Sequence, residues 1–411
     1  MDDISENANI KGYPGGKCGS YLKKFGSTVR AVESDVLQKA LRCGTDQNGY
    51  QSYFCVDCGI VHRICFSCKT RLCSKCGEKA NEAFAERFVR RMLPVTHRHI
   101  TFTIPDRLWG LFHSSPQLQH GLSRAAKQSI EKIMNIYLGR EVTPGYMEVL
   151  HNFGRDLKEN CHVHMIVTEG GTDKDGVWHR FTYFPFEKRG HISITLNEMW
   201  RDEVLELLRT HLPRTQSNHQ FLMGFKNRYP DGFYVHSPSE NRIKTNRNLR
   251  KKAKYITRYV KHPVISDSRI MSYDGEKIKF WYQQPTSRGK KIVVMPVLEF
   301  IHAVLNHLPE KGFRAVTYYG LYSPNYPQKA RIQMVFTSQG IVADPLNLDW
   351  RESRYLKTGR DPICCPICGR KMVLVSAIYK KNGDFITCYY LSIYDRMAID
   401  YPDDEMWLSI N

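Results

Sequence analysis

Two histidines separated by one residue, His162 and His164, lie in a run of β-branched and apolar residues typical of a strand. Alternate side chains of a strand point to the same face, so both imidazoles share one face. His151, in the strand-like run 145–154, would lie on the preceding strand. The three imidazoles could bind one divalent ion. A His-x-His pair can also be purely structural. A catalytic metal site is therefore expected only if a second catalytic group, such as a nucleophile, lies elsewhere in the chain.

Two tyrosines spaced by one helical turn, Tyr255 and Tyr259, are candidates for this second catalytic group. Residues 246–262 predict a helix that ends before Pro263. Nearby cations favour the phenolate, which can attack a phosphodiester and leave a 5′-phosphotyrosine. A second tyrosine would allow a second cleavage. The apolar stripe of this helix lies on another face and comprises Leu249, Ala253, Ile256 and Val260.

Seven of the thirteen cysteines fall between Cys43 and Cys76, which in a reducing compartment indicates metal ligands rather than disulfides. Two Cys-x-x-Cys pairs can complete the tetrahedral shell of a structural Zn²⁺. One site or two interleaved sites are both compatible with the spacing. We interpret residues 35–85 as a zinc module that presents Lys69 and Arg71 to DNA. The expected zinc ligands are Cys43, Cys55, Cys58, Cys68, Cys73 and Cys76, with Cys65 and His62 as further candidates.

A further pair, Cys365 and Cys368, lies in the sequence CCPICGRKM near the end of the chain. It could hold another zinc ion with Cys364 and Cys388 as partners. Only one well-spaced pair is present, so the sequence is equally compatible with cysteines that bind no metal.

The net charge of +19, from 60 Lys and Arg against 41 Asp and Glu, indicates a polyanionic partner. Residues 241–262 alone hold nine Lys or Arg and no Asp or Glu. The apolar content of 42% is that of an ordinary globular protein. The first residues lack the features of a signal peptide, which predicts a cytoplasmic protein, associated with the nucleoid when bound to DNA. The expected contacts to the DNA backbone are Arg250, Lys251, Lys252, Lys254 and Arg258.

Strand-like segments in the middle of the chain are mixed with two helix-like segments, which predicts an α+β fold built on an antiparallel sheet. The expected strands are 99–105, 145–154, 161–171 and 177–185, and the expected helices are 117–138 and 194–212. At roughly 100–200 residues per domain, the length predicts two or three domains. We expect an N-terminal extension (1–34), a zinc-binding DNA-recognition domain (35–90), a nuclease domain (91–288), a mixed accessory region (289–360) and a C-terminal region with a possible zinc knuckle (361–411).

Together these motifs resemble the rolling-circle insertion-sequence transposases of the IS91 type. LHNFGRDLKENCHVHMIVTEGG is similar to the HUH motif of that family, and KYITRYVKHPVISDSRIMSYDGEKIKFWY to its two-tyrosine motif. The N-terminal cysteines, the segment MPVLEFIHAVLNHLPEKGFRAVTYYGLYS and the CPICGRKM ending also resemble the family. The similarity extends over nearly the whole chain from about residue 35.

The resemblance implies an HUH endonuclease domain with a ferredoxin-like antiparallel sheet, and Mg²⁺ or Mn²⁺ at His162 and His164, with His151 as the third ligand. It also implies that Tyr255 and Tyr259 nick and rejoin single-stranded transposon ends. Two alternatives stay open. A plasmid relaxase or replication initiator would use the same chemistry, whereas a zinc-dependent DNA-binding regulator would use the histidines and tyrosines only structurally.

Overall fold

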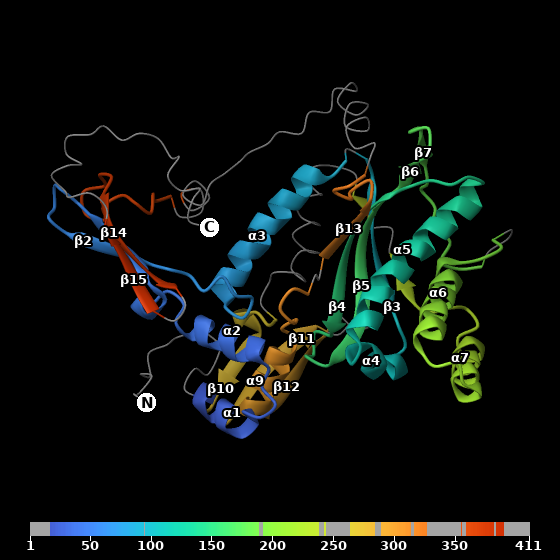
Figure 1. Cartoon of the computed structure of the whole chain (residues 1–411), viewed down its shortest axis with the longest axis horizontal. Helices are drawn as coiled ribbons and strands as arrows, with labels where there is room; N and C mark the ends of the chain where they lie inside the picture. The colour runs from blue at the N-terminus through green and yellow to red at the C-terminus, as the bar shows by residue number, and fades with distance from the viewer. Residues whose placement is uncertain are drawn as a thin grey trace.

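The computed structural model shows an α+β protein in which every described strand pairing is antiparallel, as the sequence predicts (Figure 1). Tyr255, Tyr259 and the basic residues 250–258 lie outside the described residues. The description covers residues 17–93, 95–188, 192–237, 242–243, 264–283, 289–313, 316–326, 355, 359–381 and 384–389.

A six-stranded sheet forms the centre of the largest part of the protein. Its strand β5 lies between β4 and β3, so the expected His-x-His strand is an interior strand. The order is β13-β4-β5-β3-β8, and β9 also pairs with β3. The strands are β3 (His97–Thr103), β4 (Gly145–Phe153), β5 (Glu159–Thr168), β8 (Val235–His236), β9 (Arg242–Ile243) and β13 (Val316–Gly320).

One face of this sheet is covered by helices (Figure 1). Val163, Met165 and Val167 of β5 point into the apolar core on this side, as the pleat predicts. The long helix α5 begins at the N-cap Ser115, followed by Pro116, and ends at Gly139, whose φ of 64° suits a left-handed C-cap. The helices on this side are α4 (Asp106–His113), α5 (Pro116–Leu138), α6 (Leu196–His211) and α7 (Gln216–Arg228).

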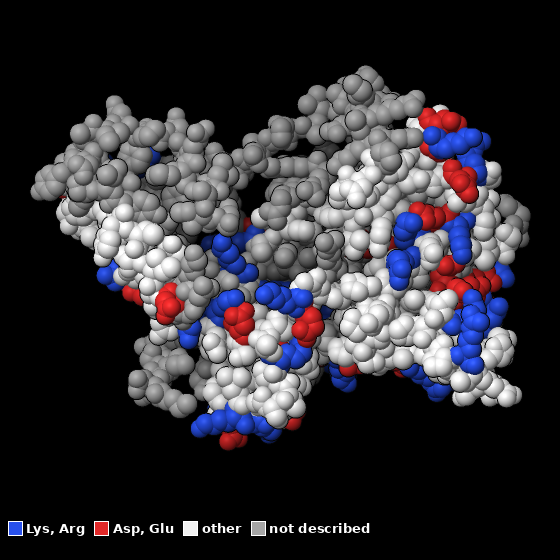
Figure 2. Space-filling view, viewed as in Figure 1, with Lys and Arg blue, Asp and Glu red and all other residues white. Residues whose placement is uncertain are grey.

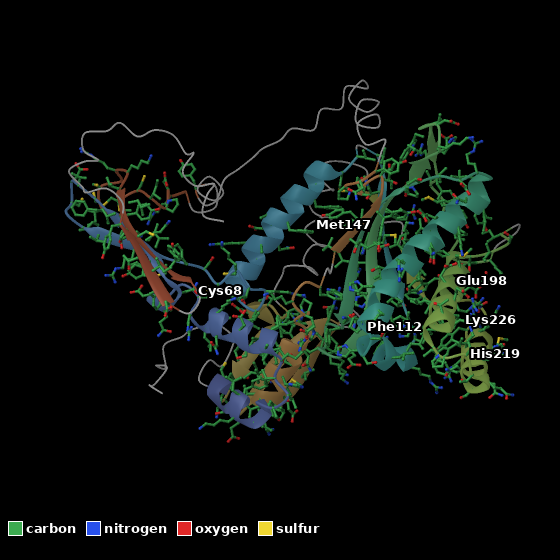
Figure 3. All side chains as sticks on the ribbon, viewed as in Figure 1. Cys68, Phe112, Met147, Glu198, His219 and Lys226 are labelled. Carbon is green, nitrogen blue, oxygen red and sulfur yellow. The ribbon has the colours of Figure 1, made fainter. Side chains whose placement is uncertain are left out.

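The opposite face packs against α3 (Ser74–Arg91). Phe88 of this helix contacts Met147, Val149 and Ile166, which are the side chains of β4 and β5 that point away from α5. Figure 3 accordingly places Met147 on the α3 side of the sheet. The histidine-bearing face is therefore the α3 face.

A second apolar core joins the N-terminal helices to residues that follow the predicted tyrosine helix. Tyr21 is fully buried there, and its hydroxyl lies 3.1 Å from Nδ1 of His302. The elements are α1 (Cys18–Phe25), α2 (Ala31–Leu41), η4 (Asp267–Arg269), β10 (Ile270–Tyr273), β11 (Lys277–Gln283), β12 (Lys290–Pro296) and α9 (Val297–Asn306).

A four-stranded sheet pairs a hairpin of the N-terminal part with two strands near the C-terminus, in the order β15-β14-β1-β2 (Figure 1). The hairpin β1–β2 follows the short helix η2 and carries Cys65 as its last residue. The elements are η2 (Asp46–Asn48), β1 (Tyr50–Phe54), β2 (Val61–Cys65), β14 (Val373–Lys381) and β15 (Asp384–Tyr389).

Residues 177–185 form a shorter strand than the sequence predicts. Only β7 (Trp178–Arg180) is a strand, and it pairs with β6 (Gly170–Thr172). Phe181 and Phe184 leave the strand and turn into the helix-covered core. Among the described residues, no helix has the length and apolar character that a membrane-spanning helix requires.

Candidate functional site

Three imidazoles meet on the α3 face of the central sheet. His151 of β4 lies directly opposite His162 of β5, and His164 lies opposite Val149. Directly opposed residues of an antiparallel pair share a face, so strand register alone brings the three rings together. The ring centroids of His162 and His164 are 4.9 Å apart, and those of His151 and His162 are 5.1 Å apart. One nitrogen from each ring lies within 4.8 Å of the others, and we call this group the histidine cluster.

Hydrogen bonds fix the orientation of two of these rings. Nδ1 of His162 lies 2.7 Å from the carbonyl oxygen of Asn160 and donates to it. Nδ1 of His164 lies 3.1 Å from Thr101 Oγ1 and 3.1 Å from His99 Nε2, both on β3. In each ring Nε2 is then the nitrogen that would bind an ion.

Burial keeps His162 and His164 uncharged. It lowers the pKa of His162 to about 4 and that of His164 well below its usual value. The neighbouring imidazoles and the guanidinium of Arg155 lower the pKa of His164 further. A metal binds the neutral imidazole, so at neutral pH no proton has to leave these two rings before an ion binds. The donor set therefore fits a divalent ion.

His99, Thr101 and Arg155 are residues of this site that sequence reasoning missed. His99 has a signal in the sequence, because it belongs to a His-x-His pair of its own, with His97. His97 contacts the hydroxyl of Tyr322 at 2.5 Å, away from the cluster. Strand pairing of β3 with β5 was needed to recognise that His99 and Thr101 hold His164.

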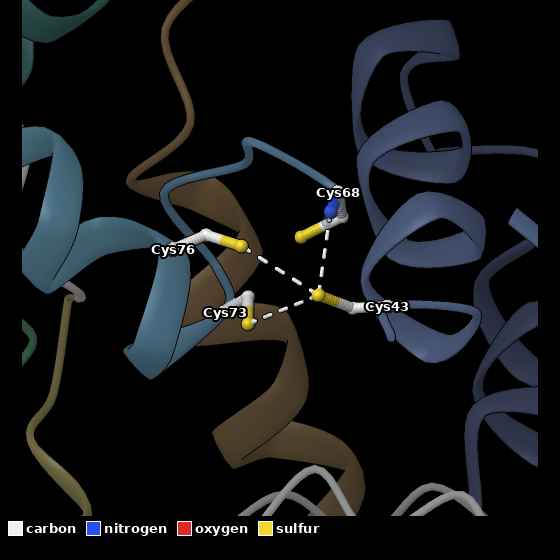
Figure 4. Close-up of side chains that lie close together, drawn as sticks. All are labelled: Cys43, Cys68, Cys73 and Cys76. Carbon is white, nitrogen blue, oxygen red and sulfur yellow. Dashed lines mark hydrogen bonds between the residues drawn. The ribbon is translucent and has the colours of Figure 1, made fainter. Parts of the chain in front are cut away.

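Four thiols meet where α2, the β1–β2 hairpin and α3 join (Figure 4). Cys43 Sγ lies 3.5 Å from Cys76 Sγ and 3.6 Å from Cys73 Sγ, and it accepts a hydrogen bond from the amide of Cys68. A Zn–S distance of about 2.3 Å in a tetrahedron separates the ligand sulfurs by about 3.8 Å, so this spacing fits zinc. Cys73 and Cys76 lie at the start of α3, where the helix dipole favours thiolates. We call Cys43, Cys68, Cys73 and Cys76 the first thiol cluster.

Cys55 and Cys58 do not join this group. They meet Cys365 and Cys368 from the other end of the chain, and these four form the second thiol cluster. The pairs Cys55/Cys58 and Cys73/Cys76 thus belong to separate clusters. Cys65 donates instead to Asp46, and His62 lies on β2 outside both clusters.

Basic and acidic side chains are interspersed over the described part of the face shown in Figure 2. Lys69 is exposed in the loop between Cys68 and Cys73, and its φ of 53° is left-handed. Arg71 is half-buried and lies close to His307, where burial lowers the pKa of the imidazole and the charge of Arg71 lowers it further. Among the described residues, these two are the predicted DNA contacts that can be placed.

Comparison with known proteins identifies the family. Residues 17–104 match the family described as "Transposase zinc-binding domain", and residues 145–330 match the family described as "Putative transposase". The transposase for insertion sequence element IS801 of Pseudomonas savastanoi pv. phaseolicola is 27% identical over 380 residues, which cover 88% of each chain. The chain belongs to the IS91-type transposases.

A second relative of this IS91-type transposase has nearly the same extent. The protein named "Putative transposase y4qJ" of Sinorhizobium fredii is 24% identical over 407 residues, covering 89% of this chain and 96% of the relative. No solved structure matches. A transposase acts on DNA, so DNA is the partner of the chain.

The matched ranges divide the candidate residues of the IS91-type transposase. The zinc-binding match spans the first thiol cluster together with Cys55 and Cys58. The transposase match spans the histidine cluster and also Tyr255 and Tyr259. Cys365 and Cys368 lie outside both ranges.

Proposed function

We propose that this transposase nicks and rejoins single-stranded DNA at the ends of an insertion sequence through a 5′-phosphotyrosine intermediate. The observation that carries the proposal is the histidine cluster, in which three imidazoles of two adjacent strands converge within 4.8 Å. Its position on an interior strand of an antiparallel sheet supports an HUH-type, ferredoxin-like nuclease fold. The order of the histidine and tyrosine motifs, both inside the transposase match, supports the same chemistry.

His151, His162 and His164 would hold the active-site ion. Three imidazoles fit a divalent transition ion such as Mn²⁺, and Mg²⁺ would bind here while keeping several of its waters. When bound, the ion would polarise the scissile phosphate and neutralise charge on its non-bridging oxygens. Thr101 and His99 would hold the His164 ring in one orientation, and Asn160 would do the same for His162.

Tyr255 and Tyr259 would be the nucleophiles. The oxygen of one tyrosine attacks phosphorus, the bond from phosphorus to the 3′ oxygen breaks, and the 3′-hydroxyl leaves with a proton. The 5′ end stays bound to the tyrosine as a phosphodiester. A 3′-hydroxyl of another strand end can later attack this phosphorus and release the tyrosine. The reaction needs no nucleotide triphosphate, because the phosphotyrosine bond keeps the energy of the phosphodiester bond that was broken.

The basic residues around the tyrosines would hold the DNA backbone. Arg250, Lys251, Lys252, Lys254 and Arg258 surround Tyr255 in sequence. We expect binding to weaken steeply with salt, and the slope to fall by about one for each backbone contact that is removed. Lys69 and Arg71 of the zinc module would add contacts outside the nuclease site.

The decisive experiment incubates the protein with labelled single-stranded transposon-end DNA and Mn²⁺ or Mg²⁺. We expect a covalent protein–DNA adduct that survives denaturation and disappears with EDTA. The Tyr255→Phe/Tyr259→Phe variant should form no adduct. Tyr183→Phe is the matched control, because Tyr183 is 57% exposed and lies outside the cluster.

Undiminished cleavage by the double variant would reject the tyrosine mechanism. Binding of the DNA without cleavage under all metal conditions would instead favour a DNA-binding regulator. Both single variants, Tyr255→Phe and Tyr259→Phe, then decide which tyrosine performs the first cleavage.

A further inference from the structure

The second thiol cluster is assembled from two loops with the same local sequence and backbone. One loop, CVDCG, is the turn between β1 and β2, and the other, CPICG, precedes β14. In both, the last glycine has a left-handed φ, 67° at Gly59 and 75° at Gly369. Each glycine amide donates to the carbonyl of the first cysteine at 2.9 Å, Gly59 to Cys55 and Gly369 to Cys365.

The sulfur atoms of the two loops face each other. Cys55 Sγ lies 3.5 Å from Cys368 Sγ, and Cys58 Sγ lies 3.9 Å from Cys365 Sγ. A disulfide would need about 2.05 Å, whereas a tetrahedral zinc site places its sulfurs about 3.8 Å apart. The amide of Ile367 also points at Cys365 Sγ at 3.4 Å, which stabilises a thiolate.

Contacts around the four cysteines hold the two loops next to each other. Strand β1 pairs with β14, with Phe54 opposite Val373. Outside the sheet, Arg370 of one loop forms an ion pair with Asp57 of the other. Beneath the sulfurs, Tyr53 and Met372 are buried together with Cys55 and Cys365.

We propose that Cys55, Cys58, Cys365 and Cys368 bind a second structural Zn²⁺, which joins the N-terminal hairpin to a segment more than 300 residues further along the chain. The zinc module is then discontinuous, because its second metal site is complete only when the C-terminal segment docks on the hairpin. Cys55 and Cys58 lie inside the zinc-binding match, which ends at residue 104, whereas Cys365 and Cys368 lie beyond it. The proposed site is independent of the nuclease chemistry.

The other cysteines near the C-terminal pair have different neighbours. The backbone of Cys364 forms an isolated antiparallel β-bridge with Lys371, and Cys388 Sγ lies 3.8 Å from the hydroxyl of Tyr379. These two thiols therefore provide a matched control for the two proposed ligands.

Zinc content of the purified full-length protein tests the proposal. We expect two zinc ions per chain, one in Cys365→Ser/Cys368→Ser, and two in the control Cys364→Ser/Cys388→Ser. Two ions retained in Cys365→Ser/Cys368→Ser would overturn the site.

Thiol labelling of the unmodified protein is a second test that needs no variant to fold. Cys368 is exposed, so without metal it should react readily with N-ethylmaleimide. We expect it to be protected, and to become reactive together with Cys55, Cys58 and Cys365 when zinc is chelated. Labelling of Cys368 before chelation, at the rate of Cys65 or faster, would contradict the proposal.

Discussion

The histidine cluster lies on neighbouring strands inside a six-stranded sheet, whereas both thiol clusters lie in loops and at the ends of helices and strands. Below the histidines, the other face of β5 packs into the largest apolar core of the protein. In the first thiol cluster, Cys68, Cys73 and Cys76 form a small buried group of their own, with Cys43 partly buried beside them.

This difference indicates opposite roles for metal. Strand register and apolar packing hold the histidines in place, so an ion there would serve chemistry and leave the fold unchanged. The apolar clusters around the thiols are much smaller than the core beneath the histidines, so an ion there would supply folding energy.

The largest effect is expected in the histidine cluster. His162→Ala/His164→Ala removes two of three ligands and should lower cleavage about 10³-fold, which corresponds to about 4 kcal/mol of transition-state stabilisation. The amides of β4 and β5 should keep their protection from hydrogen exchange. The control His219→Ala, on α7, should cleave normally (Figure 3). Loss of protection throughout the sheet would show that the ligands are also needed for the fold.

The second prediction concerns the first thiol cluster. Cys73→Ser should increase hydrogen exchange in the β1–β2 hairpin and at the start of α3, because the ion that joins them is lost. The central sheet should stay protected. Cys65→Ser is the control, since Cys65 bonds to Asp46 outside the cluster. Equal hydrogen exchange in Cys73→Ser and Cys65→Ser would show that the first thiol cluster has no structural role.

The sequence already predicted the histidine cluster, because its geometry depends on strand alternation and on two adjacent strands. His162 and His164 are two residues apart, and His151 lies on the strand just before them. The α+β class and the limits of α5 and α6 followed from the same local patterns.

The second thiol cluster could not be predicted in this way. Its pairs are separated by most of the chain, and Cys364 and Cys388 were equally plausible partners from spacing alone. Likewise, nothing local indicates that Thr101 contacts His164, because that contact depends on the pairing of β3 with β5. Phenylalanine is common in strands, which is why Phe181 and Phe184 were expected in one. In the structure both side chains are buried in the apolar core, and this burial outweighs strand pairing.

The third prediction tests whether the histidine face is rigid without metal. Burial lowers the pKa of His97 to about 3, from an ordinary value of 6.5. The unfolded chain therefore binds the proton more readily, and stability falls as pH drops below about 6.5. At pH 5 the loss from this residue is about 2 kcal/mol. Urea unfolding at pH 7 and pH 5 should show it, and His97→Gln should lose less stability over this range than the parent. Equal losses would mean that His97 is solvated and this face is loose.

The smallest effect is expected from Thr101, whose hydroxyl lies 3.1 Å from Nδ1 of His164. Thr101→Val keeps the shape of the side chain and removes this hydrogen bond. If the hydroxyl fixes the ring for an ion, Mn²⁺ affinity should fall about 10-fold, the lower end of the range for outer-shell partners of metal ligands. Thr103→Val is the control, because its hydroxyl donates to the carbonyl of Tyr234 instead. Calorimetric titration with Mn²⁺ measures both. An unchanged affinity in Thr101→Val would show that strand register and His99 alone orient the ligand, which would strengthen the contrast with the thiol clusters.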